Sequence, residues 1–247
     1  MMKKSLLLLA VVGATVPVVS FAADEAPAVS VSVNAGVVSD YRYRGISQSR
    51  LKPAVQGGVD YAFANGFYIG AWASSIKWIK DAGGGANAEV DLYGGYKTEL
   101  AKDLTIDVGV LRYQYPSADL SVSPNTTEVY GALTYGPATL KYSHSVTNLF
   151  GFADTKGSGY IDLSASFDVG GGVMLAPHVG YQKVKGISLA SYTDYSLTVS
   201  KDFSGLLLSA AVVGTDTKDV PGSYAYVSPD GKNLGRTTAV LGVKYTY

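Results

Sequence analysis

Apolar and polar residues alternate along most of the sequence after residue 23, which is the pattern of β-strands with one apolar face. Spacings typical of helices are scarce over the same stretch. The first alternating segment places Val29, Val31, Val33, Ala35, Val37, Ser39, Tyr41 and Tyr43 on one face, and Ser30, Ser32, Asn34, Gly36, Val38, Asp40, Arg42 and Arg44 on the other. The pattern predicts an all-β protein.

Twelve alternating segments follow one another along the chain. They lie near 29–44, 53–63, 67–76, 88–98, 104–113, 127–135, 138–146, 159–168, 173–182, 193–200, 206–213 and 237–247. Two of them depart from the pattern. Segment 206–213 is apolar on both faces, and Pro177 interrupts segment 173–182, where its missing N–H removes a ladder hydrogen bond unless a bulge accommodates it.

The connections between these segments are alternately short and long. The short ones are 64–66, 99–103, 136–137, 170–172 and 201–205, and the long ones are 45–52, 77–87, 114–126, 147–158, 183–192 and 214–236. In an up-and-down arrangement, every short turn then lies at one end and every long loop at the other. Outer-membrane barrels have this layout. We therefore predict an up-and-down antiparallel transmembrane β-barrel of about 12 strands over residues 23–247.

The turn at Asn65-Gly66 leaves the orientation of segment 67–76 open. A two-residue turn would place Tyr68 and Trp72 on the same face as Val59, whereas a three-residue loop with Gly66 in the left-handed region would place Ile69 there. A shift of one residue exchanges the two faces of a strand.

The apolar faces are predicted to meet lipid rather than the core of a soluble β-sandwich. Charged residues occupy the middle of the polar faces, and aromatic residues lie toward the ends of the apolar ones, as in the girdles of membrane barrels. These rings are Tyr41, Tyr43, Tyr61, Phe63, Tyr96, Tyr135, Tyr181 and Tyr245. The expected partners are outer-membrane lipid and lipopolysaccharide. The terminal Tyr245-Thr246-Tyr247 resembles the signal that the outer-membrane assembly machinery reads.

Residues 1–22 have the features of a Sec-type signal peptide. Lys3 and Lys4 precede an apolar stretch, and Ser20-Phe21-Ala22 offers small residues at the −3 and −1 positions of a cleavage site. We expect this segment to be cleaved on export, which places the protein in the outer membrane of a Gram-negative bacterium. No cysteine is present, which excludes a disulfide framework.

If the apolar faces are outside, ionic side chains fill the interior. The expected lumenal residues are Asp40, Arg42, Arg44, Gln56, Asp60, Glu89, Asp91, Lys97, Asp107, Glu128, Lys141, Asp162, Asp168, Asp194 and Lys244, of which nine are acids and five are bases. Such a bore favours cations or neutral polar solutes over anions. The row of Asp40, Arg42 and Arg44 is interpreted either as a charged constriction or as ion pairs that support the wall.

A 12-stranded barrel lies between the filled interior of eight strands and the open channel of sixteen. We expect loop 114–126 or loop 214–236 to fold inward and narrow the mouth. The sequence therefore predicts a small passage.

Catalytic and metal-binding patterns are weak. His144 shares the outward face with Tyr142, without a nucleophile two positions away, and His178 is expected near Asp162 or Ser164. Asp216, Asp219 and Asp230 are interpreted as solvated loop acids rather than ligands for divalent ions or lipopolysaccharide. We expect no enzyme activity, no cofactor, no metal and no nucleic acid, since the chain is formally neutral and only 16% charged.

Two stretches carry a family resemblance. Val38-Ser39-Asp40-Tyr41-Arg42-Tyr43-Arg44-Gly45-Ile46-Ser47-Gln48, followed by Gln56-Gly57-Gly58-Val59-Asp60-Tyr61, resembles the TorF family of Gram-negative outer-membrane porins, and blocks 66–74 and 89–96 look similar to later parts of that family. The resemblance implies an outer-membrane barrel and passive transport, without established site residues. The predicted function is a porin-like channel for small polar solutes or ions. The alternatives are a barrel with a closed bore whose loops bind a partner, and an outer-membrane hydrolase.

Overall fold

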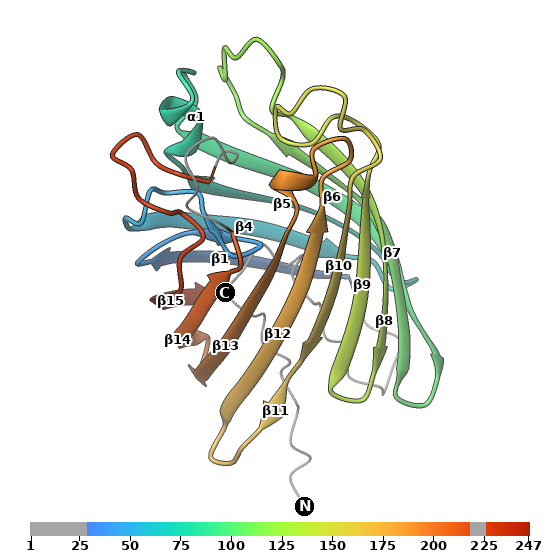
Figure 1. Ribbon diagram of the computed structural model, residues 1–247. Coiled ribbons are helices and arrows are strands. Elements are labelled where there is room, and N and C mark those ends of the chain that lie inside the picture. Colours follow the sequence, from blue (N-terminus) through green and yellow to red (C-terminus); the bar gives the residue numbers. More distant parts are fainter. Residues whose placement is uncertain (1–28, 218–225) are drawn as a thin grey trace, which may run out of the picture.

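All twelve alternating segments form wall strands of one antiparallel sheet in the computed structural model, which describes residues 29–217 and 226–247 (Figure 1). The wall consists of β1 (Ser30–Val38), β4 (Ala54–Ala62), β5 (Phe67–Ser75), β6 (Ala88–Ala101), β7 (Leu104–Gln114), β8 (Thr126–Tyr135), β9 (Ala138–Ser145), β10 (Gly159–Ala165) with its continuation β11 (Phe167–Asp168), β12 (Val173–Lys183), β13 (Tyr192–Phe203), β14 (Leu206–Thr215) and β15 (Thr238–Thr246). Neighbours in sequence pair with each other, and β1 pairs with β15, so the sheet closes into a barrel of the predicted strand number.

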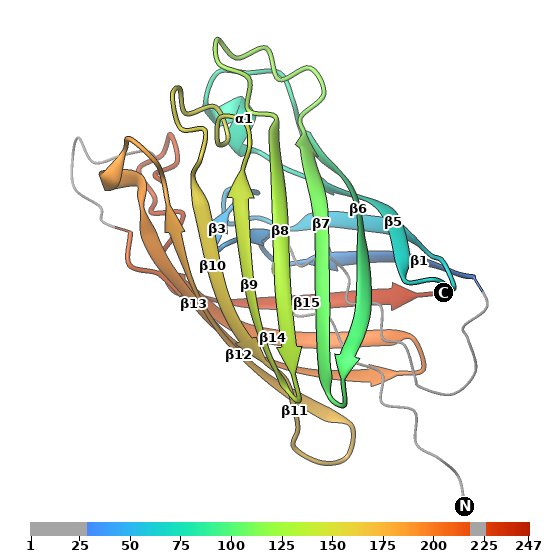
Figure 2. The same ribbon diagram turned by 90° about the vertical axis from the view of Figure 1, so that its right-hand side faces the viewer.

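The short turns and the long loops lie at opposite ends of the barrel, as the alternation of their lengths predicts. Figure 2 shows strands β6 to β10 side by side, with their tight turns at the lower end and the longer loops above. We call these the turn end and the loop end. The loops carry the short helix α1 (Trp78–Asp81) and a 3₁₀ turn at Ser188–Ala190. Within the described residues, no helix is long and apolar enough to cross a bilayer.

The turn between β4 and β5 resolves the orientation that the sequence left open. The N–H of Phe63 donates to the carbonyl of Phe67 at 2.8 Å, and Gly66 has a φ of +90°. Residues 64–66 thus form the three-residue loop, and Ile69 pairs with Tyr61. Ile69 is exposed on the outer face, while Tyr68 is buried inside.

Pro177 interrupts the ladder where its missing N–H predicts a defect. On one side of β12, pairing stops between Ser164–His178 and Phe167–Leu175, which separates β10 from β11. On the other side, pairing with β13 continues through Pro177 and Leu197. The proline therefore costs pairing on one edge of β12 only.

Large aliphatic side chains are exposed on the outer face of every wall strand. Examples in strand order are Val31, Val55, Ile69, Leu92, Val108, Val129, Leu140, Ile161, Val179, Leu197, Leu208 and Leu241. Exposed rings of Phe63, Tyr135, Tyr181 and Tyr245 lie toward strand ends. A continuous apolar surface of this kind needs a non-aqueous partner, and a closed barrel leaves no unpaired strand edge in lipid.

The first predicted strand is wrong in its second half. β1 ends at Val38, and residues 39–53 leave the wall and fold into the barrel, carrying the short strands β2 (Arg42–Tyr43) and β3 (Ile46–Ser47). Tyr41 and Tyr43, predicted to face lipid, are only 3% and 8% exposed. We call residues 39–53 the inner hairpin. It takes the inward position that the sequence assigned to loop 114–126 or loop 214–236.

The predicted signal peptide and Asp219 lie outside the described residues. The described parts of loops 114–126 and 214–236 pack against the inner hairpin. Leu120 packs against the cluster that contains Tyr41 and Tyr43, and Leu234 packs against Ile46.

Candidate functional site

The tip of the inner hairpin is a tight turn at Arg44-Gly45. Tyr43 pairs with Ile46, and the two central residues have φ values of 45° and 79°, the signs of a type I′ turn. Gly45 also lies close to the wall, because a Cβ on it would meet Thr215 Cγ2 at 2.5 Å and Asp194 Cβ at 2.8 Å. Position 45 therefore favours glycine, both because its φ is positive and because the wall leaves no room for a side chain.

Asp40 holds the base of the inner hairpin together. Its carboxylate accepts hydrogen bonds from Arg42 Nε at 2.6 Å, from Ser47 Oγ at 2.5 Å and from Ser49 Oγ at 3.1 Å. Arg42 also donates through Nη1 to the carbonyl oxygens of Gly45 and Leu234. Burial lowers the pKa of Arg42, and the ion pair with Asp40 opposes this effect. These two residues fix the fold of the hairpin rather than facing an open bore.

Arg44 connects the inner hairpin to the far wall of the barrel. Its Nη2 donates to Glu128 Oε2 at 2.7 Å and its Nη1 to Gln182 Oε1 at 2.6 Å. Glu128 lies on β8 and Gln182 on β12, which are five and four strand pairings away from β1 in the two directions around the sheet. The hairpin therefore spans the bore.

The side chain of Arg44 is 7% exposed, and its guanidinium lies over the ring of Tyr160, with Cζ 4.1 Å from the ring centroid. Desolvation disfavours its charge, but attraction to Glu128 outweighs this and raises the pKa of Arg44. A cation–π contact of this kind is strongest when water is excluded. The end of the hairpin is thus a desolvated ionic anchor.

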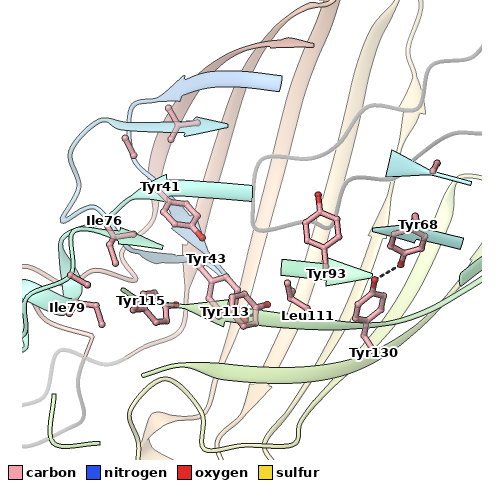
Figure 3. Packing of buried hydrophobic residues seen from close by; sticks show 14 residues of the cluster. Tyr41, Tyr43, Tyr68, Ile76, Ile79, Tyr93, Leu111, Tyr113, Tyr115 and Tyr130 are labelled. Carbon is pink, nitrogen blue, oxygen red and sulfur yellow. Dashed lines mark hydrogen bonds between the residues drawn. The ribbon is translucent and has the colours of Figure 1, made fainter. Parts of the chain in front are cut away.

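A row of buried rings follows the inner wall from the loop end toward the turn end. Figure 3 shows this row, beginning near Ile76 and Ile79, continuing through Tyr43 and ending at Tyr68 and Tyr130. In the part of the row nearer the loop end, Tyr41 donates a hydrogen bond to Glu89 Oε1 at 2.6 Å, and Tyr43 donates one to the hydroxyl of Tyr113 at 3.0 Å. Burial raises the pKa of Tyr41, so its hydroxyl remains a neutral donor.

Between the inner hairpin and the turn end, tyrosine hydroxyls donate hydrogen bonds to carboxylates on other wall strands. Tyr93 on β6 donates to Asp60 Oδ1 on β4 at 2.5 Å. Tyr68 on β5 donates to Asp107 Oδ1 on β7 at 2.5 Å and also bonds to Tyr130 on β8. Both acids therefore accept a hydrogen bond from a tyrosine hydroxyl, which satisfies an oxygen without cancelling its charge.

The structure places the predicted lumenal residues as follows. Buried are Asp40, Arg42, Asp60, Glu89, Asp91, Glu128 and Asp194, and half-buried are Gln56, Lys97, Asp107, Lys141, Asp162 and Lys244. Arg44 is half-buried as a whole residue, but its side chain is buried. Asp168 is exposed at the turn end, where its Oδ1 accepts from the N–H of Gly170. It keeps the same strand parity as Asp162 in the register with β12, so its lumenal assignment stays a prediction, but at this end of the barrel it is open to solvent.

Tyrosines of the inner face are a part of the site that the periodicity did not single out. Tyr93, Tyr130 and Tyr160 fall on the same face of their strands as Asp91, Glu128 and Asp162 respectively. That shared parity was the available signal. Parity places these rings on the polar faces, but it does not indicate that their hydroxyls reach acids on other strands.

The two histidines lie on different faces. His178 contacts Asp162 through Nε2, as expected, and its Nδ1 is 3.6 Å from Asp194 Oδ1. His144 lies on the outer side, with Nδ1 3.4 Å from the hydroxyl of Tyr142. In the described part of the chain, no group of three or more His, Cys, Asp or Glu residues is arranged to hold a metal ion.

A protein-family model matches nearly the whole chain. The model of a family described as "Bacterial protein of unknown function (Gcw_chp)" matches residues 22–247. Comparison with curated protein sequences gives no match.

Two solved porin structures share the fold. The KdgM porin, solved in complex with disordered oligogalacturonate, is 10% identical with a TM-score of 0.56. The NanC porin is 10% identical with a TM-score of 0.52. Each alignment covers 88% of this chain and 98% of the other. At this identity the likeness shows a shared β-barrel fold.

Proposed function

This chain belongs to the Gcw_chp family of bacterial proteins, and we propose that it is an outer-membrane channel for the passive diffusion of small polar solutes or ions. One observation carries the proposal: the closed barrel turns aliphatic side chains outward on every strand and ionic side chains inward. A soluble protein gains nothing from that inversion, whereas a passage through lipid requires it. The resemblance of segment 38–61 to TorF porins supports the same function.

The inner hairpin makes this a narrow channel. It reaches from β1 to Glu128 and Gln182 on the far wall, so solutes must pass beside it rather than through an unobstructed bore. We propose low conductance and a small size limit.

We propose that the charged side chains of the lumen select solutes by the sign of their charge. Without Asp168 at the exposed turn end and the Asp40–Arg42 pair within the inner hairpin, the predicted lumenal set retains seven acids and four bases. A negative surplus in a narrow, low-dielectric passage disfavours anions. An acidic oligosaccharide, such as the oligogalacturonate bound by the KdgM porin, is therefore a poor fit to this chain.

The surroundings of the barrel follow from the same proposal. The apolar outer face would contact outer-membrane lipid, with lipopolysaccharide at the loop end. The strand that ends in Tyr247 would present the assembly signal. We propose that the protein resides in the outer membrane of a Gram-negative bacterium, after export through the predicted signal peptide.

A second candidate is a barrel with a closed bore whose loops bind a partner. The anchor of Arg44 on Glu128 favours it, because a desolvated ion pair across the bore resists opening. Reconstitution of the purified protein into planar bilayers separates the two. Discrete conductance steps support the channel, and an electrically silent but folded, heat-modifiable barrel supports the closed bore.

A further inference from the structure

A cavity opens at the loop end of the barrel, directly above the inner hairpin. Its volume is about 530 Å³, within the usual range of ligand pockets. Tyr43, Ile46 and Gln48 of the inner hairpin form part of its lining, and residues of the outer loops complete it. A solute entering from the loop end would meet this cavity before the narrow part of the bore.

Aromatic rings dominate the lining of the cavity, and their positions are fixed by edge-to-face contacts. Trp78 packs against Tyr115 with ring centroids 5.1 Å apart, and Tyr192 packs against Tyr226 at the same separation. Phe152, from the loop between β9 and β10, adds a further ring. Rings held in this way present apolar surface without a large loss of side-chain entropy on binding.

The lining carries almost no charge. Asp81 is the charged side chain among the described lining residues, and it is paired with Arg50. Polar groups are instead neutral, from Ser47, Gln48, Gln182 and Ser228. Nothing in this described lining would compensate the desolvation of an ionic ligand.

One polar atom beside the cavity lacks a partner. The indole Nε1 of Trp78 is buried and makes no hydrogen bond within the described part of the chain. A buried donor without an acceptor costs free energy, and a small rotation of the Trp78 side chain toward a bound ligand would let a ligand oxygen satisfy it. The cavity thus combines apolar ring surface, neutral amides and hydroxyls, and an unpaired donor.

We propose that this cavity binds a neutral saccharide of one or two sugar units. A sugar ring has an apolar face of C–H groups that packs on aromatic rings, and hydroxyls around its edge that bond to amides, hydroxyls and an indole N–H. If neutral saccharides are also the solutes that the channel transports, that part of the proposal rests on the proposed function. The net negative bore beneath the cavity agrees with it, since a neutral solute is not repelled there.

Trp78 provides a direct reporter of binding. The chain has two tryptophans, so W72F leaves Trp78 as the single one and keeps a ring beside Tyr41. The detergent-solubilised W72F protein is titrated with maltose, with glucuronate and glucosamine as anionic and cationic analogues, and with benzyl alcohol as an aromatic probe. We expect a saturable change in Trp78 emission with maltose and a much weaker response to the other three.

Substitutions in the lining test whether maltose binds in this cavity or elsewhere on the protein. In the W72F background, F152L and Y226L each remove a ring and are expected to weaken maltose binding about tenfold, the equivalent of one aromatic contact. F67L makes the same kind of change on the outer face at the turn end and is expected to leave binding unaltered. Heat-modifiability on gels checks that each variant is folded.

The proposal is overturned if maltose gives no saturable change, if the charged analogues or benzyl alcohol bind as well as maltose, or if F152L and Y226L bind it as tightly as their parent. Conductance of the same preparation is recorded separately. Conductance without maltose binding would overturn this proposal and leave the channel standing. Maltose binding without conductance would support the cavity site and contradict the channel.

Discussion

Arg44 and Glu128 lie 84 residues apart in the sequence and meet inside the barrel through two parallel hydrogen bonds of 3.1 and 2.7 Å. The arginine belongs to the inner hairpin and the glutamate to β8. Because both side chains are nearly fully buried, this pair determines where the hairpin ends and how much of the bore it covers.

Breaking this pair should destabilise the barrel strongly. R44A leaves the buried carboxylate of Glu128 without its cation, which typically costs about 3–5 kcal/mol, and R44A/E128A should recover a large part of that loss. The free energy of unfolding in detergent, measured for both single variants and the double variant, checks this coupling.

Arg50 supplies the matched control for that cycle. It lies in the same hairpin, but its side chain is 37% exposed where it pairs with Asp81. The Asp81 side chain is 10% exposed, so R50A is expected to cost about 1–2 kcal/mol, more than a surface pair but less than R44A. Equal losses for R44A and R50A would contradict the anchoring role of Arg44.

Gly45 is expected to tolerate no side chain. G45A places a methyl group against Thr215 and Asp194 at a φ of +79°, so both strain and steric overlap oppose it. We expect a loss of about 1–3 kcal/mol and easier proteolysis within residues 39–53. Limited proteolysis and thermal unfolding measure the two effects.

A substitution at Gly231 distinguishes the cost of backbone strain from the cost of steric overlap with the wall. Its φ is +77°, but a Cβ at this position would meet no described atom within 4 Å, so G231A tests the backbone conformation alone. G45A should be clearly the more destabilising of the two, and a similar cost for both would show that contact with the wall is unimportant.

The hydroxyl of Tyr93 should stabilise the folded barrel through its hydrogen bond to Asp60. Y93F leaves the carboxylate of a residue that is 6% exposed without its donor, and an unsatisfied buried group costs about 1–3 kcal/mol. Tyr135 is 68% exposed on the outer face, so Y135F is expected to change the free energy of unfolding very little. Thermal unfolding of the two variants side by side provides the measurement.

Charge filtering is tested by reversal potentials in a salt gradient. The wild-type channel should prefer cations, and D107N should lower that preference because it removes a negative charge from the lower bore while retaining an acceptor for Tyr68. D103N removes the same charge from an exposed turn and should have a much smaller effect. Anion preference in the wild type would contradict the filter.

Strand number, loop alternation and the outward apolar face could be predicted because each follows from local periodicity. Every wall strand carries an exposed aliphatic residue on its outer face. The orientation of β5 could not be predicted, because Tyr68 and Ile69 are both apolar enough for either face. Only the hydrogen bond between Phe63 and Phe67 decides it.

The inner hairpin could not be predicted from periodicity. Residues 39–44 continue the alternation of β1, so the pattern alone extends the strand through Tyr43. What removes them from the wall is a set of non-local contacts, namely Arg44 with Glu128 and Gln182, and Arg42 with Leu234. Contacts between residues so distant in sequence leave no trace in a window of about ten residues.

The barrel is expected to conduct, and the inner hairpin is expected to limit its conductance. Single-channel recording in planar bilayers compares the wild-type protein with a variant in which residues 42–47 are replaced by a Gly-Ser linker. We expect small discrete steps for the wild type and steps several times larger for the variant. Equal conductance of the two proteins, or silence from both as folded barrels, would contradict it.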